Sequence, residues 1–171
     1  MKISIRMNKK QTRRTLREKV LQILYAYEMN GEGLTTLTEG IIADLREEND
    51  KEFCRQLVNK VVANKKILDS KIGERVDNWE LNRIAMIDKV LLRMGISELL
   101  FFPDIPPKVS INEVIEIAKN FSTPNSGKFI NGILDTVLSE LKDSGTLSKS
   151  GRGLLDEALP KRNGKQDKQE D

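Results

Sequence analysis

Three arginines near the beginning of the chain are spaced to bind phosphate groups. Arg13, Arg14 and Arg17 lie within five residues of one another, and on a helix positions 13 and 17 share a face with position 14 beside them. A guanidinium donates from a planar fork to two phosphate oxygens at once. The cluster, extended by Lys10, therefore predicts contacts to a nucleic-acid backbone, with a solvated helix start as the alternative.

The net charge of the chain is concentrated at this end. The first 20 residues carry a net charge of +7, whereas all 171 residues together carry only +3. Lysines and arginines that neutralise phosphates release condensed counterions, so a basic pole on a slightly acidic body favours a polyanionic partner. The sequence therefore predicts binding through one end of the molecule.

Tyr25 is placed to stack on a nucleic-acid base. The apolar stripe of the helix that follows the arginines includes Leu24 and Tyr27, and residues 25 and 27 differ by about 200° around a helix axis. Stacking on an aromatic ring contributes ~1–3 kcal/mol per base and suits single-stranded RNA, whose bases can be splayed out. A half-exposed tyrosine without a ligand is the alternative.

A second aromatic and basic group flanks a polar loop. Phe121 precedes this loop, and Lys128 and Phe129 follow Ser126 at the start of the last predicted helix. Unsatisfied backbone N–H groups favour anions at a helix start, so rings beside a lysine there indicate a nucleotide platform. Packing at the edge of the core is the alternative for both phenylalanines.

The composition excludes several enzyme classes. The chain has no histidine and a single cysteine, Cys54, which removes the histidine-dependent nucleophile pairs and nearly every zinc site. Gly-rich phosphate loops are also absent, so we expect no catalysis, metal or cofactor. The lone cysteine and the lack of a long apolar run predict a cytoplasmic protein, no membrane partner and a core position for Cys54.

Helices must position these groups, because apolar residues recur at three- and four-residue steps almost throughout. The pattern predicts an all-α bundle of about seven helices. The predicted helical stretches are residues 13–30, 35–47, 50–73 with a bend near the end, 77–102, 110–121 and 126–141. Capping signals mark their starts at Asn49 with Glu52, Asp77 with Glu80, Ser110 with Glu113, and Ser126. Val109 and Val114 are expected to form a hydrophobic staple around the Ser110 box.

The chain divides into three parts on composition. We expect residues 1–12 to form a flexible basic arm and residues 13–144 to form one RNA-binding domain. Residues 145–171 are rich in Gly, Ser, Lys and Asp and contain few residues to bury. They are therefore predicted to be a disordered tail.

Four blocks of sequence, in this order, resemble the NusB family of bacterial transcription antitermination factors. The blocks are residues 13–25 (RRTLREKVLQILY), 79–99 (beginning WELNRI), 107–118 (PKVSINEVIEIA) and 128–135 (KFINGILD). Each block alone is a weak signal, but their order and spacing together are specific. The resemblance spans nearly all of the predicted helical domain.

The resemblance implies a fold of two three-helix subdomains packed across each other. It also implies a non-enzymatic protein that binds single-stranded boxA RNA of ribosomal RNA leader transcripts with the ribosomal protein NusE, within the antitermination complex of RNA polymerase. The RNA contacts of the family fall on Arg13, Arg14, Arg17, Tyr25, Phe121, Lys128 and Phe129, and on Asn125 at a loop position where an acid can occur. Positions that face NusE fall on Asp88 and Asn82.

Two other functions stay open at this point. NusB-like helical domains also precede the catalytic part of certain RNA cytosine methyltransferases, so the chain could serve a separate methyltransferase. Alternatively, it could be a protein-binding scaffold, such as a homodimer, in which the basic end is only a solvated face.

Overall fold

The computed structural model describes residues 12–76 and 81–155. The described residues form seven α-helices and one 3₁₀ helix, and none of them lies in a strand. The helices are α1 (Arg13–Asn30), α2 (Leu34–Ile42), α3 (Glu48–Ala63), α4 (Lys65–Gly73), α6 (Met86–Phe101), α7 (Pro107–Phe121), α8 (Ser126–Asp143) and the 3₁₀ helix η1 (Gly151–Leu154). The prediction of an all-α fold is confirmed.

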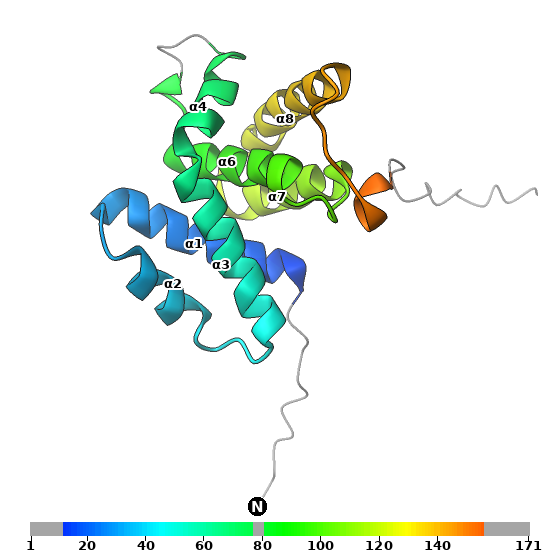
Figure 1. Ribbon diagram of the computed structural model, residues 1–171. Coiled ribbons are helices and arrows are strands. Elements are labelled where there is room, and N and C mark those ends of the chain that lie inside the picture. Colours follow the sequence, from blue (N-terminus) through cyan, green and yellow to red (C-terminus); the bar gives the residue numbers. More distant parts are fainter. Residues whose placement is uncertain (1–11, 77–80, 156–171) are drawn as a thin grey trace, which may run out of the picture.

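The helices pack as two groups of three. Helices α1, α2 and α3 contact one another, and so do α6, α7 and α8. Helix α6 also contacts α1, α3 and α4, so it lies at the centre of the molecule (Figure 1). This arrangement agrees with the two three-helix subdomains that the family resemblance implies.

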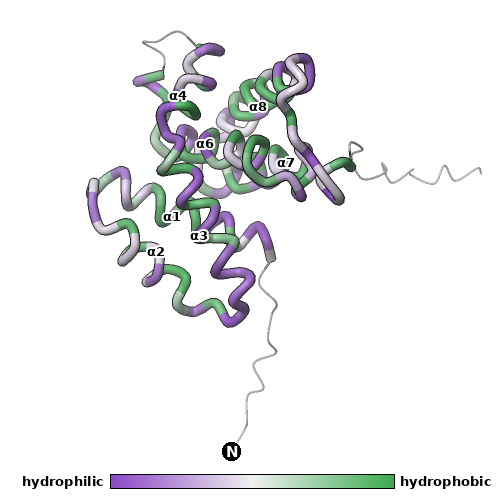
Figure 2. Tube along the Cα trace, viewed as in Figure 1, coloured by the Kyte–Doolittle hydropathy of each residue, from purple (hydrophilic) through white to green (hydrophobic). Residues whose placement is uncertain are grey.

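Helix α6 is buried on all sides, as its apolar pattern predicts. Every residue from Val90 to Leu99 is buried, and hydrophobic residues concentrate where α6, α7 and α8 meet (Figure 2). Gly95 lets α8 approach closely, because a Cβ there would lie 2.9 Å from a methyl group of Leu134. None of the described helices combines the length and apolar character that a membrane crossing requires.

Helix α1 has the predicted boundaries because both of its ends are capped. The side chain of Thr12 accepts a hydrogen bond from the backbone N–H of Thr15. Gly31 follows the helix with a φ of 75°, a left-handed conformation that glycine adopts without steric cost, and donates its N–H to the carbonyl of Tyr27. The cap at Thr12 places Arg13 and Arg14 in the first turn of the helix.

The predicted capping box of α7 is wrong. The helix begins three residues earlier, at Pro107, whose fixed φ and missing N–H suit the first helical position. Ser110 therefore lies inside the helix and is buried, and Glu113 faces α1 rather than its own helix start. The staple is also absent, because Val109 is exposed whereas Val114 is buried.

Other predicted helix ends shift by several residues. Helix α3 begins at Glu48, so Asn49 lies within it, and the break at Asn64 separates α3 from α4. Helix α2 ends at Ile42 rather than at residue 47. Helix α6 begins at Met86 rather than at residue 77, because the described residues 82–85 form a turn and are not helical. The predicted cap of Asp77 with Glu80 lies outside the described residues.

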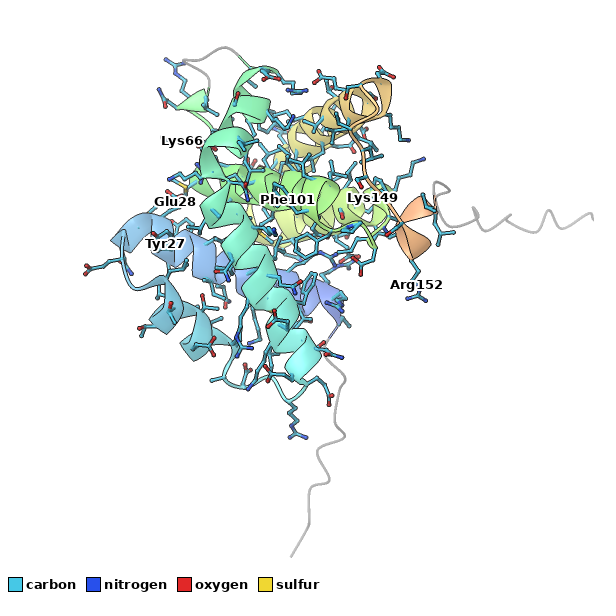
Figure 3. The ribbon with its side chains drawn as sticks, in the orientation of Figure 1. Tyr27, Glu28, Lys66, Phe101, Lys149 and Arg152 are labelled. Carbon is cyan, nitrogen blue, oxygen red and sulfur yellow. The ribbon has the colours of Figure 1, made fainter. Side chains whose placement is uncertain are left out.

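Residues 145–155 of the predicted tail are largely exposed, but Lys149, Ser150 and Gly153 contact the chain at the end of α6. The ammonium of Lys149 donates to the carbonyls of Glu98 at 3.0 Å and Phe102 at 2.8 Å, and so satisfies the open end of that helix. The Ser150 N–H donates to the Pro103 carbonyl at 2.9 Å. Burial lowers the pKa of Lys149. Figure 3 shows Lys149 over the helices and Arg152, two residues beyond Ser150, pointing away from them.

Gly153 completes this contact because no side chain fits at its position. A Cβ there would lie 1.8 Å from the carbonyl oxygen of Pro103. Residues 156–171, the rest of the predicted tail, lie outside the described residues, as do residues 1–11 of the predicted arm.

Candidate nucleic-acid interface

Helix α1 presents two arginines at its first turn. Arg13 and Arg14 are exposed, and the guanidinium of Arg13 lies 4.3 Å from the centroid of the Phe53 ring on α3. A cation over an aromatic face is attracted by the ring quadrupole, so this contact orients Arg13. The first backbone N–H groups of a helix add to the positive potential here. Lys10 lies outside the described residues.

Arg14 is paired across to α7. Its Nε and Nη2 donate to the two carboxylate oxygens of Glu113, both at 2.9 Å. The pair is open to solvent, because 44% of the Arg14 side chain is exposed. The hydrogen bonds to Glu113 raise the pKa of Arg14, so the guanidinium stays charged.

Arg17 does not face solvent, which corrects the prediction that it binds a phosphate. Only 3% of its side chain is exposed, and its Nε and Nη2 donate to Glu98 on α6 at 2.9 and 2.6 Å. Burial opposes its charge, but the hydrogen bonds and attraction of Glu98 outweigh burial and raise the pKa of Arg17. The hydroxyl of Ser110 donates to the same carboxylate at 2.9 Å. Arg17 therefore joins α1, α6 and α7.

The spacing of α1 contained a signal for this burial. Arg17 precedes Val20 by three residues and Leu24 by seven, so it lies on the apolar stripe rather than beside it. Glu98, which no local pattern marks as functional, lies within a run of buried residues on α6, and a buried carboxylate requires a cationic partner. The partner itself comes from 81 residues away in the chain.

Tyr25 lies on the surface of α1, as predicted. The residue is 39% exposed, whereas Tyr27 is partly buried and lines a small cavity between α1, α3 and α6. The ring of Tyr25 is therefore accessible to a base. Whether it binds one stays a prediction.

The turn between α7 and α8 groups the second set of predicted residues. Phe121 ends α7, and Lys128 and Phe129 lie in the first turn of α8. The two phenylalanines are 39% and 37% exposed, and Lys128 and Asn125 are exposed as well. No side chain caps α8, and the Ser126 N–H donates to the Thr123 carbonyl at 3.0 Å. The helix start still carries a positive potential that favours an anion. The structure thus brings two aromatic rings, a lysine and a helix start to one turn.

Asp88 holds this turn from inside, and this placement corrects its predicted role at a partner surface. It is buried and accepts hydrogen bonds from the hydroxyls of Ser122 at 2.5 Å and Ser126 at 2.8 Å. Ser126 is the first residue of α8 rather than its predicted cap. Its hydroxyl bonds to Asp88 on α6 instead. Asn82 is exposed before α6, so a partner can reach it.

Comparisons with known proteins identify the family. A sequence profile of the NusB family matches residues 14–139. The chain belongs to the NusB family. Its match covers every residue of α1 from Arg14 onward, and continues through most of α8.

Curated relatives are similar over most of their length. The transcription antitermination protein NusB of Chloroherpeton thalassium is 49% identical over 147 residues, which cover 85% of this chain and 70% of the relative. The corresponding protein of Salinibacter ruber is 44% identical over 146 residues, covering 84% and 91%.

Solved structures share the fold. T. maritima NusB superposes with a TM-score of 0.72 at 38% identity, covering 77% of this chain and 94% of that one. A structure of the antitermination factors NusB and NusE in complex with dsRNA gives a TM-score of 0.69 at 22% identity, covering 75% and 96%. At that identity the second likeness supports the fold alone.

Proposed function

We propose that this protein is a transcription antitermination factor that binds single-stranded boxA RNA of ribosomal RNA leader transcripts together with NusE. The observation that carries the proposal is the exposed pair Arg13 and Arg14 at the start of α1, in a chain of the NusB family. In the cytoplasm, the complex would help RNA polymerase to pass termination signals. The protein has no catalytic part in this proposal.

Helix α1 and the α7–α8 turn both contact phosphates and bases in this proposal. Arg13, Arg14 and Lys128 neutralise phosphates, while Tyr25, Phe121 and Phe129 stack on bases. Asn125 adds no negative charge to the α7–α8 turn, which favours an approaching phosphate. Arg17 and Asp88 hold the helices that carry these residues.

Binding of labelled boxA-like RNA, measured by fluorescence anisotropy with and without NusE, tests the proposal. We expect single-stranded boxA to bind more tightly than a scrambled strand, and NusE to strengthen binding. With about three phosphate contacts, log affinity should fall against log salt with a slope of about −2. Equal binding of all RNAs with a flat salt dependence would contradict the proposal and favour a protein-binding homodimer.

Single substitutions locate the surface. Tyr25→Ala should weaken binding by ~1–3 kcal/mol, whereas Tyr25→Phe retains the ring and most of the affinity. Arg55→Ala is a matched control for Arg14→Ala. Arg55 lies on α3 and, like Arg14, donates two hydrogen bonds to the carboxylate of a glutamate, Glu39 of α2. The proposal fails for this surface if Arg55→Ala weakens RNA binding as much as Arg14→Ala does.

A further inference from the structure

The ion pair between Arg14 and Glu113 occupies the same guanidinium edge that a phosphate would use. Both hydrogen bonds run from Nε and Nη2 to the two carboxylate oxygens at 2.9 Å. A phosphate accepts two parallel hydrogen bonds from an arginine in the same manner. A carboxylate and a phosphate therefore cannot both hold this edge of Arg14.

We propose that Glu113 competes with RNA phosphate for Arg14 and thereby sets the affinity and salt dependence of RNA binding. The inference rests on the proposed function and adds a residue that opposes it. In the free protein, Glu113 neutralises Arg14. On binding, a phosphate replaces the carboxylate, and Glu113 turns to solvent.

The exchange is feasible because the pair is exposed. Arg14 is 44% and Glu113 21% exposed at the side chain, and solvent-exposed ion pairs contribute little to stability. Release of Glu113 leaves the carboxylate next to water rather than in the protein interior. The only lasting cost is a negative charge near the bound RNA.

The frame around the pair stays closed during this exchange. One turn further along α1, Arg17 remains bonded to Glu98, which also accepts from Ser110 of α7. This buried network ties α1 to α7 independently of Glu113. The pair of Arg14 with Glu113 can therefore open without separation of the helices, and Arg14 stays in place for the phosphate.

Glu113→Gln tests the competition, because glutamine keeps the shape of the side chain and removes its charge. Glu116→Gln is the matched control: it makes the same charge change one turn along α7, where Glu116 pairs with Lys119 at 2.6 Å. The affinity for a single-stranded boxA-like RNA would be measured by anisotropy over a range of salt concentrations, for both variants with and without Arg14→Ala.

We expect Glu113→Gln to bind RNA about two- to fivefold more tightly at low salt, since it removes a competing exposed pair. The gain should be larger than that of Glu116→Gln and should vanish when Arg14→Ala is also present. The salt slope of Glu113→Gln should steepen by up to about 0.7, because no freed carboxylate takes up a cation.

Nuclear magnetic resonance gives a readout that a structural role would not move. The Nε–Hε signal of Arg14 should shift when RNA is added, whereas that of Arg17 should not. Equal gains in the two glutamine variants, a gain that survives Arg14→Ala, or an unmoved Arg14 signal would overturn the inference while the proposed function stands. Wild-type protein that binds no RNA would overturn both.

Discussion

Arg14 and Arg17 lie one turn apart on α1, and each donates two hydrogen bonds to a glutamate, yet their surroundings differ. The pair of Arg17 with Glu98 is buried and receives a third hydrogen bond from Ser110, whereas the pair of Arg14 with Glu113 is open to solvent. A buried charge without its partner is costly, while an exposed charge is hydrated by water. The pair of Arg17 with Glu98, here called the inner pair, therefore holds the helices in place. The pair of Arg14 with Glu113, the outer pair, can exchange its partner for a ligand.

This difference shows that chemistry alone does not assign a role to an arginine. Both residues have the fork geometry that binds phosphate, and both lie in the basic cluster. Burial decides that one holds three helices together and that the other is available to a ligand. Each prediction below tests this distinction between the inner and the outer pair.

The largest expected effect is on the inner pair. Arg17→Ala should lower the free energy of unfolding by about 3–5 kcal/mol, because it leaves the Glu98 carboxylate buried without a cation. Urea denaturation followed by circular dichroism measures this loss. The double variant Arg17→Met with Glu98→Leu should recover most of the stability, since it removes both charges. A loss below 1 kcal/mol would mean that the two pairs are equivalent.

Labelling of Cys54 provides a second measure of the same difference. The thiol is buried and donates to the Leu16 carbonyl at 3.7 Å, next to Arg17, and burial raises its pKa to about 11. At pH 8 the native thiol should react slowly with iodoacetamide, and reaction should follow unfolding. Arg17→Ala should accelerate labelling by about a hundredfold or more, and Arg14→Ala by less than fivefold. Similar rates in both variants would contradict the comparison.

The raised pKa of the Cys54 thiol predicts how the stability of the protein changes with pH. The folded pKa of the thiol lies above the usual value of 9.0, so its contribution to stability is complete below pH 9 and is lost as pH rises toward 11. The free energy of unfolding, measured by urea denaturation, should therefore be lower at pH 10 than at pH 8. Cys54→Ala should show a smaller decrease; an equal one would remove the thiol as the cause.

A smaller effect is expected from the third hydrogen bond that only the inner pair has. Ser110→Ala should lower the free energy of unfolding by about 1–3 kcal/mol, because one oxygen of the buried Glu98 carboxylate loses a donor. Ser139→Ala, at an exposed position of α8, is the control and should change stability by less than about 0.5 kcal/mol. Thermal or urea unfolding distinguishes the two.

The smallest effect on stability is expected from the outer pair. Arg14→Ala should change the free energy of unfolding by less than about 1 kcal/mol, because both partners are hydrated. Its effect should appear instead in weaker RNA binding. The slope of log affinity against log salt should become shallower by at most about 0.7, because cation uptake by the freed Glu113 offsets part of the counterion release in the wild type. Destabilisation as large as that of Arg17→Ala would remove the distinction between the pairs.

Local patterns of the chain predicted the helices better than their ends. The boundaries of α1 follow from its apolar stripe and from Gly31, and the buried nature of α6 follows from its apolar residues on every side. The start of α7 was misplaced because the Ser110 and Glu113 box fits a cap, yet Pro107 starts the helix earlier and both side chains bond to other helices. A capping motif is a local signal that tertiary contacts can override.

The tail shows the same limit. Residues 145–155 have a polar, Gly-rich composition, and no local pattern indicates that Lys149 meets two carbonyls at the end of α6 or that Gly153 fits against Pro103. These contacts join parts of the chain that are about 50 residues apart. Composition reports how much a segment can bury, but it does not report an acceptor elsewhere that the segment can satisfy.

Periodicity, charge and motif order are properties of neighbouring residues, and they were enough to establish the helical fold, the basic pole and the family. The exposure of Arg14, the burial of Arg17 and the inward position of Asp88 were decided only when distant helices packed. The physical reason is that a charged side chain takes its role from its partner and from its access to water. For these residues both are supplied by helices that lie far away in the chain.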